Sequence, residues 1–165
     1  KYSPLMVAKP IYGRGGANIY KIKNKNEFLF YKKKKDYLVQ KFIDGTEYTA
    51  DCLFDHKGKL IFNLPRKRLL HKGVSIIGKI VQDKKISKFV DDIAKHLTFY
   101  GPINVQLIKD NNNKIWLIEI NPRLSGSIEF SIKAGFNPLL YFKSKKDKFK
   151  IKYGLILKRY FQISI

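Results

Sequence analysis

The stretch Ile118-Glu119-Ile120-Asn121-Pro122-Arg123-Leu124-Ser125-Gly126-Ser127 alternates apolar residues with an acid, an amide and a guanidinium. This period of two predicts a strand that ends near Pro122, with Glu119, Asn121 and Arg123 on one side. A side that faces water would explain these polar residues as well as a ligand site would. The pattern by itself therefore leaves both interpretations open.

The residues upstream of this strand predict a hairpin. Residues 111–114 are polar and follow a second apolar strand candidate at residues 103–108. We expect Asp110 to pair with Ile115 across this turn, because Asn and Asp favour tight turns between strands.

Counting back along such a hairpin places Gln106 opposite Glu119 and Asn104 opposite Asn121, on one side of the sheet. A carboxylate flanked by amide oxygens is a set of hard donors, which Mg²⁺ accepts when phosphates supply its other ligands. Arg123 adds a planar fork of donors suited to a phosphate oxygen. The alternative is a solvated sheet face, for which we expect a less ordered mixture of Lys, Thr and Glu.

Near the N-terminus, Lys9 ends a strand candidate and is followed by Gly13-Arg14-Gly15-Gly16. Glycines let backbone N–H groups approach phosphate oxygens, and a nearby ammonium neutralises their charge. The spacing matches neither the Walker A motif nor the dinucleotide fingerprint. An ordinary hairpin loop is the alternative.

A third candidate feature is the apolar strand at residues 37–42, which ends at Asp44-Gly45 and leads toward Glu47. Backbone groups at a sheet edge can hold an adenine, and a carboxylate can accept ribose hydroxyls. The alternative is a strand followed by an exposed Glu.

Composition limits the class of protein. The chain has 165 residues, 44% of them hydrophobic, and no run as long as the roughly 20 apolar residues of a membrane span. Without such a run, we expect a soluble, cytoplasmic protein without membrane contact. The lone Cys52 excludes an internal disulfide, which agrees with a reducing compartment. The net charge of +21 favours anionic ligands, but the basic residues are spread along the chain. We therefore do not expect nucleic acid as the main partner.

The predicted elements indicate an α+β fold. Strand candidates 47–55 and 59–64 surround a turn, and the segment 83–100 has the apolar spacing of an amphipathic helix. Residues 28–31 predict a turn or a short helix, and 127–134 a helix. Strand pairs followed by single helices favour this class over a doubly wound sheet.

In order along the chain, VAKPIYGRGGANIY, LVQKFIDGTEYTADCLFD, GPINVQ and IEINPRLSGS resemble the ATP-grasp superfamily, most nearly its carbamoyl-phosphate-synthetase-like branch. The resemblance implies two lobes with antiparallel sheets flanked by helices. Residues 1–45 would be part of the small lobe with the glycine-rich loop, and 46–165 the large lobe with the metal and phosphate site. The N-terminal α/β domain usual in such enzymes would be absent, so we expect a fragment or one component of a split enzyme.

The resemblance also implies a role for each group of candidate residues. Those that bind the nucleotide would be Lys9, Gly13, Gly15, Gly16, Gln40, Lys41, Phe42, Ile43 and Glu47. Those that hold Mg²⁺, or Mn²⁺ in its place, would be Gln106, Glu119 and Asn121. Arg123 would be the catalytic residue that faces the transferred phosphoryl group or the acyl substrate.

The implied activity is that of a ligase that uses ATP to turn a small carboxylate into an acyl phosphate, which an amine or another nucleophile then attacks. Its partners would be ATP, the carboxylate and the missing domain or a companion subunit. Arg66 and Arg68 are candidates for binding the acid, with a solvated basic loop as the alternative. Two other functions stay open: a non-catalytic nucleotide-binding module and a basic polyanion-binding protein.

Overall fold

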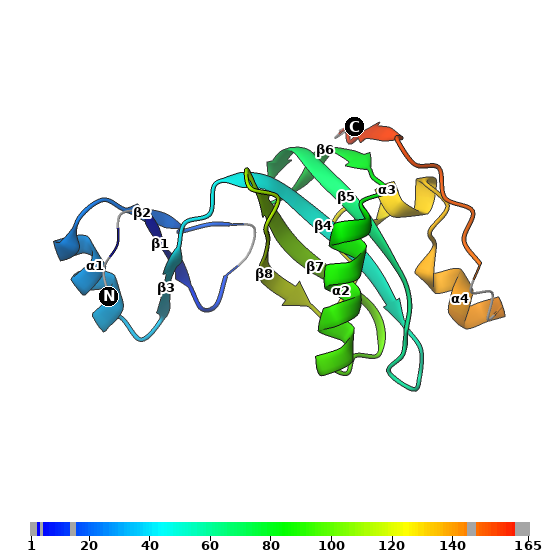
Figure 1. The fold of residues 1–165 in the computed structure, drawn as a ribbon, viewed down its shortest axis with the longest axis horizontal. Coiled ribbons are helices and arrows are strands. Elements are labelled where there is room, and N and C mark those ends of the chain that lie inside the picture. The colour runs from blue at the N-terminus through cyan, green and yellow to red at the C-terminus, as the bar shows by residue number, and fades with distance from the viewer. Residues whose placement is uncertain (1–2, 4, 14–15, 145–147, 161–165) are drawn as a thin grey trace, which may run out of the picture. The chain divides into compact units, whose positions relative to one another are not determined.

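Two antiparallel sheets organise the protein, as Figure 1 shows for the computed structural model, which describes residues 3, 5–13, 16–144 and 148–160. The chain divides into two compact units, Lys1–Asp44 and Gly45–Ile165. The α+β class and the antiparallel sheets predicted from the sequence are confirmed. The boundary predicted between the two lobes, after residue 45, lies one residue later than the boundary between these units. The roles given to the lobes stay predictions.

The N-terminal unit is a three-stranded sheet in the order β2-β1-β3 with one helix. Its elements are β1 (Met6–Pro10), β2 (Tyr20–Ile22), α1 (Lys25–Lys33) and β3 (Tyr37–Lys41). Ala8, Ile22 and Phe28 form its buried core. The sequence predicted only a turn or short helix where α1 lies. The longer helix forms because Asn24 accepts a hydrogen bond from the backbone of Glu27, whose carboxylate accepts one from Lys23 N.

The C-terminal unit is a six-stranded sheet in the order β8-β7-β4-β5-β6-β9. Its strands are β4 (Gly45–Phe54), β5 (Leu60–Lys72), β6 (Val74–Ile80), β7 (Gly101–Asp110), β8 (Ile115–Asn121) and β9 (Ile156–Lys158). Its helices are α2 (Lys84–His96), α3 (Ile128–Lys133) and α4 (Pro138–Ser144). No helix in the described part of the chain is long and apolar enough to cross a membrane.

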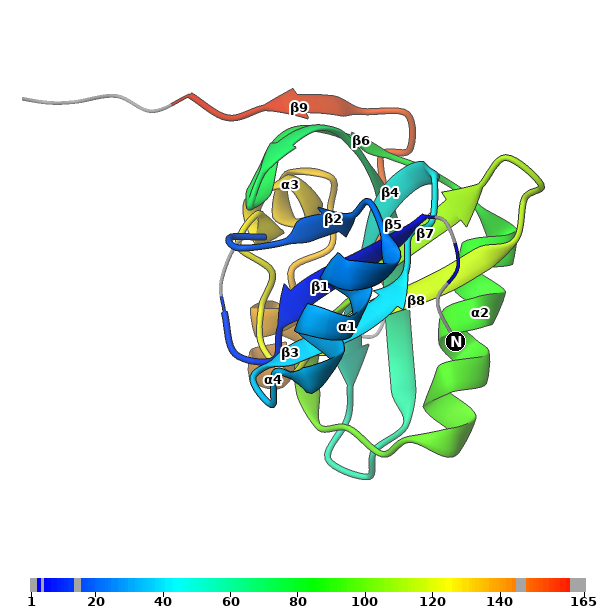
Figure 2. The same ribbon diagram turned by 90° about the vertical axis from the view of Figure 1, so that its left-hand side faces the viewer.

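The two faces of this sheet are covered differently. Helix α2 covers one face, as Figures 1 and 2 show, and its Ile86 and Val90 are buried against side chains from β4 and β7. A smaller apolar cluster lies on the other face, where Leu53, Leu64 and Ile80 contact residues beyond α3. The remainder of that second face carries polar side chains. The strand period of two thus separates the face that packs against α2 from one that can hold a site.

The hairpin register predicted for the polar residues is confirmed, but the register predicted for the turn is wrong. Gln106 pairs with Glu119 and Asn104 with Asn121, as expected. Asp110 does not pair with Ile115, which faces Lys109 instead. The Asp110 carboxylate accepts hydrogen bonds from two backbone N–H groups of the turn, and the turn is one residue shorter than predicted. A bulge between Gln106 and Leu107 then restores the expected register.

Helix α2 begins at a charged cap that makes stability depend on pH. Asp83 accepts hydrogen bonds from the backbone N–H groups of Lys85 and Ile86, and its other oxygen lies 2.7 Å from Lys109 Nζ. Burial acts to raise the pKa of Asp83, but these hydrogen bonds and the Lys109 charge outweigh it and lower the pKa. The stabilisation is therefore present at neutral pH and is lost as the pH falls through the lowered pKa.

We expect Asp83→Ala to lower the free energy of unfolding by about 1 kcal/mol at neutral pH, because the helix loses its cap. Asp83→Asn is the matched variant, since an amide oxygen still caps the helix but carries no charge. Urea titrations at neutral and acidic pH should show the parent losing more stability on acidification than Asp83→Asn. Equal losses would contradict the assignment.

Candidate functional site

Glu119 is the centre of the polar face of the β7–β8 hairpin. Its Oε1 accepts a hydrogen bond of 2.7 Å from Gln106 Nε2 and one of 2.8 Å from Asn121 Nδ2. The structure therefore brings together the three residues that the sequence predicted as metal ligands. They come from facing positions of neighbouring strands, because the bulge keeps these side chains on one side of the sheet.

Arg68 extends this cluster along the sheet. Its NH1 donates to Gln106 Oε1 at 3.0 Å and to Glu47 Oε2 at 2.9 Å, and its NH2 donates to Gly73 O. Burial lowers the pKa of Arg68, and the Glu47 carboxylate opposes that shift. The alternative of a solvated basic loop is wrong for Arg68, because this residue lies on β5 with a side chain only 6% exposed.

Glu47 belongs to the same polar network. Besides Arg68, it has His71 as a neighbour, with His71 Nε2 at 3.4 Å from Glu47 Oε2. His71 lies on β5, which is the neighbour of β4 in the sheet. A continuous chain of polar contacts thus runs from His71 through Glu47, Arg68 and Gln106 to Glu119.

The donor set fits a hard divalent cation that is also bound by phosphates. No three His, Cys, Asp or Glu side chains gather into a metal-binding group among the described residues. An ion here would thus depend on Glu119, on amide oxygens and on its ligand's phosphates. Asn121 presents its amide nitrogen to Glu119 and would turn over to offer oxygen. Gln106 fits less well, because its oxygen already accepts from Arg68.

Arg123 lies in the loop after β8, and its side chain is exposed. Among the described residues, its guanidinium donates only to the neighbouring Leu124 O, at 3.2 Å. The carbonyl of Arg123 accepts a hydrogen bond of 3.0 Å from Asn104 Nδ2. Asn104 is 2% exposed and is therefore a buried anchor of this loop, although the sequence suggested a polar face for it.

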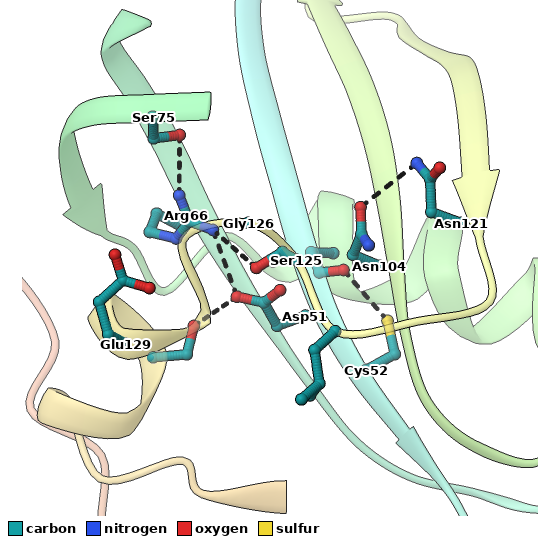
Figure 3. A network of polar contacts seen from close by, with 12 residues as sticks. Asp51, Cys52, Arg66, Ser75, Asn104, Asn121, Ser125, Gly126 and Glu129 are labelled. Carbon is teal, nitrogen blue, oxygen red and sulfur yellow. Dashed lines mark hydrogen bonds and ion pairs between the residues drawn. The ribbon is translucent and has the colours of Figure 1, made fainter. Parts of the chain in front are cut away.

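A buried polar network lies beside this loop (Figure 3). Arg66 donates to Asp51, Ser75 and Ser125, and Ser131 donates to Asp51. The sequence treated Arg66 as a substrate-binding residue or a loop residue, and missed its burial. The signal that could have found it is the alternation Leu64, Arg66, Arg68 on one side of β5.

The nucleotide-binding candidates in the N-terminal unit lie on or after β1 and β3. Lys9 is on β1 and pairs with Leu38, and Gly13 and Gly16 follow that strand. Gly16 has a φ of +76°, a conformation that favours glycine. Gly15 lies outside the described residues, so its predicted role stays untested.

The predicted adenine segment begins on an edge strand of the N-terminal sheet, because β3 is one of its two outer strands. The backbone N–H of Phe42 donates to Leu5 O. The backbone N–H and C=O groups of Phe42 and Gln40 therefore point toward β1. Antiparallel alternation then directs the backbone groups of Lys41 and Ile43 to the opposite side, toward the edge.

The family described as "ATP-grasp in the biosynthetic pathway with Ter operon" matches residues 33–153, which is most of the chain. The chain belongs to this ATP-grasp family. The match includes the polar hairpin and the loop of Arg123, whereas the glycine-rich loop precedes it.

The chain also matches relatives that are much longer. The chain is 26% identical over 175 residues to the carbamoyl phosphate synthase large chain of Clostridium acetobutylicum, covering 93% of this chain and 16% of that one. For the Campylobacter jejuni large chain the identity is 29% over 153 residues, covering 82% and 14%. The chain therefore spans less than a fifth of either relative.

Solved structures share the fold. The biotin carboxylase domain of Hydrogenobacter thermophilus 2-oxoglutarate carboxylase, in complex with MgADP, ADP and bicarbonate, has a TM-score of 0.66 at 16% identity, covering 82% of this chain and 34% of that one. The L-amino acid ligase of Bacillus licheniformis has a TM-score of 0.61 at 18% identity, covering 92% and 41%. At these identities the likeness shows the ATP-grasp fold alone.

Proposed function

We propose that this ATP-grasp chain is the ATP-binding part of a ligase that depends on Mg²⁺ and activates a carboxylate as an acyl phosphate. The observation that carries the proposal is the cluster around Glu119, where one acid and two amides share a sheet face beside the loop of Arg123. The family match and the carbamoyl phosphate synthase relatives support it.

The reaction has two steps. An oxygen of the substrate carboxylate attacks the γ-phosphorus of ATP, the bond to the bridging oxygen breaks, and ADP leaves. An amine or another nucleophile then attacks the acyl carbon and expels phosphate. Both steps gain from groups that offset negative charge and from a site that keeps water away from the acyl phosphate.

Each group of residues has a proposed part in this chemistry. Glu119 and Asn121 would hold the ion, with Gln106 joining if its oxygen leaves Arg68. When bound, Mg²⁺ would neutralise charge on the phosphate oxygens. Arg123 would donate to the transferred phosphoryl group or to the acyl substrate, since its guanidinium is exposed and, within the part of the chain that the structure describes, donates only to a neighbouring carbonyl.

Nucleotide binding is proposed for three groups of residues. Lys9, Gly13, Gly15 and Gly16 would contact the phosphates. The edge strand at Gln40, Lys41, Phe42 and Ile43 would hold the adenine, and Glu47 would accept the ribose hydroxyls. Glu47 can do so only in competition with Arg68, which donates to the same carboxylate.

Additional protein is proposed as a partner, either another part of the same polypeptide or a companion subunit. The proposal is supported by the small share of each relative that the chain spans. The substrate pocket would then be completed by residues outside this chain. For this reason the activity test uses the full-length protein.

The test is to trap the acyl phosphate. We expect the full-length protein with Mg-ATP to release ADP only when a suitable carboxylate is present, and to form an acyl hydroxamate when hydroxylamine is the nucleophile. A panel of small carboxylic acids, each assayed with and without Mg²⁺, gives the substrate class. Mg-ATP binding in a thermal shift assay without ADP release for any acid would favour the non-catalytic nucleotide-binding module instead.

A further inference from the structure

The loop at residues 122–127 joins β8 to α3 and carries Arg123, and other segments anchor its backbone and one of its hydroxyls. Three donors do so: Asn104 Nδ2 to Arg123 O at 3.0 Å, Arg66 NH2 to Ser125 Oγ at 3.4 Å and Arg159 NH2 to Gly126 O at 2.5 Å. The loop is therefore held from β7, from β5 and from the segment after β9.

Arg66 is the most deeply buried of these anchors. Its side chain is 0% exposed, and its NH2 lies 3.3 Å from Asp51 Oδ2, which Ser131 also contacts at 2.5 Å. Its NH1 donates to Ser75 Oγ at 2.9 Å. Space for it comes from Gly78, where a Cβ would lie 3.2 Å from Arg66 Cδ.

Stability does not explain why the chain keeps this pair. Taking two charges out of water is costly, and apolar residues of similar volume often replace a buried ion pair without loss of stability. Arg66 Nε and Asp51 Oδ1 are buried without hydrogen-bond partners among the described residues, which adds to that cost. The neighbouring Leu64 and Ile80 show that apolar side chains are accommodated beside it.

We propose that Arg66 is a positioning residue of the ligase site: through its ion pair with Asp51 and its bond to Ser125, it holds the loop that presents Arg123 to the substrate. The inference rests on the proposed function. Asp51 fixes the direction of the guanidinium, and Ser125 transmits that direction to the loop (Figure 3). Arg66 does not itself touch the substrate, because it is fully buried.

The first test removes one hydroxyl. In the full-length protein we expect Ser125→Ala to lower kcat about tenfold and leave the KM for ATP unchanged, because a misplaced catalytic group slows the chemical step. Ser125→Thr keeps the hydroxyl and is the matched control. In an Arg123→Ala background, Ser125→Ala should lower kcat no further, since its effect is exerted through Arg123. Equal effects in the two backgrounds would overturn the proposal.

The second test separates positioning from folding. Asp51→Leu combined with Arg66→Met replaces the ion pair by apolar residues, and should leave the unfolding midpoint close to that of the parent. We still expect the tenfold loss of kcat and faster amide hydrogen exchange at residues 122–127, with β4 and β7 unchanged. Unchanged exchange at residues 122–127 would overturn the anchoring. Lack of turnover in the parent would instead overturn the proposed function, so the two failures are distinguishable.

Discussion

Glu119→Gln is expected to abolish the effect of Mg²⁺ on ATP binding and to lower turnover by about a hundredfold or more. The substitution keeps the shape of the side chain but removes the only carboxylate in the Gln106–Glu119–Asn121 cluster. Electrostatic groups aimed at a transferring phosphoryl group typically contribute on this scale. Isothermal titration with ATP, with and without Mg²⁺, and the hydroxamate assay measure the two effects.

Asp92→Asn is the matched control for this experiment. Asp92 lies on α2, on the opposite face of the sheet, and its ion pairs with Lys88 and Lys95 are largely exposed. We expect its binding and turnover to equal those of the parent. If Glu119→Gln still bound ATP more tightly with Mg²⁺ than without it, the metal assignment would be wrong.

Asp51→Ala should be among the most destabilising single substitutions in the C-terminal unit. It leaves the Arg66 guanidinium buried without its carboxylate, at a site where both side chains are no more than 2% exposed. Breaking a buried pair in this way costs about 3–5 kcal/mol. Urea unfolding followed by circular dichroism gives the change in free energy directly.

The comparison with the paired replacement makes this prediction specific. Asp51→Leu with Arg66→Met should recover most of the loss, because no charge is left unpaired. Asp92→Ala, which breaks exposed ion pairs, should have little effect. A paired variant as unstable as Asp51→Ala would show that the network is needed for folding.

Local pattern accounts for much of the site. The alternation around Glu119 and the polar turn before it predicted that Gln106 faces Glu119 and Asn104 faces Asn121, and the register confirms both pairs. The turn itself could not be predicted to the residue, because two offsetting shifts, a tighter turn and a bulge, leave no mark in the period of two. The roles of these residues in binding metal and nucleotide stay predictions.

The sequence was weakest where a polar residue is buried by distant segments. Arg66 and Arg68 occur in a run of basic residues that is typical of a solvated loop, yet they lie on β5. Their burial depends on Asp51, Glu47 and Gln106, which are 15 to 38 residues away in the chain. Long-range partners of this kind are set by strand order, which local periodicity does not contain.

By itself, the sequence determined the α+β class, the polar hairpin and the resemblance that the family match confirms. These features are encoded locally, through alternation, turn residues and short motifs. Only the tertiary structure decided that Arg68 links Glu47 to the Glu119 cluster and that Arg66 donates to Ser125 in the loop of Arg123. The physical reason is that a buried charge requires partners, and the sheet order supplies them from strands far apart in the chain.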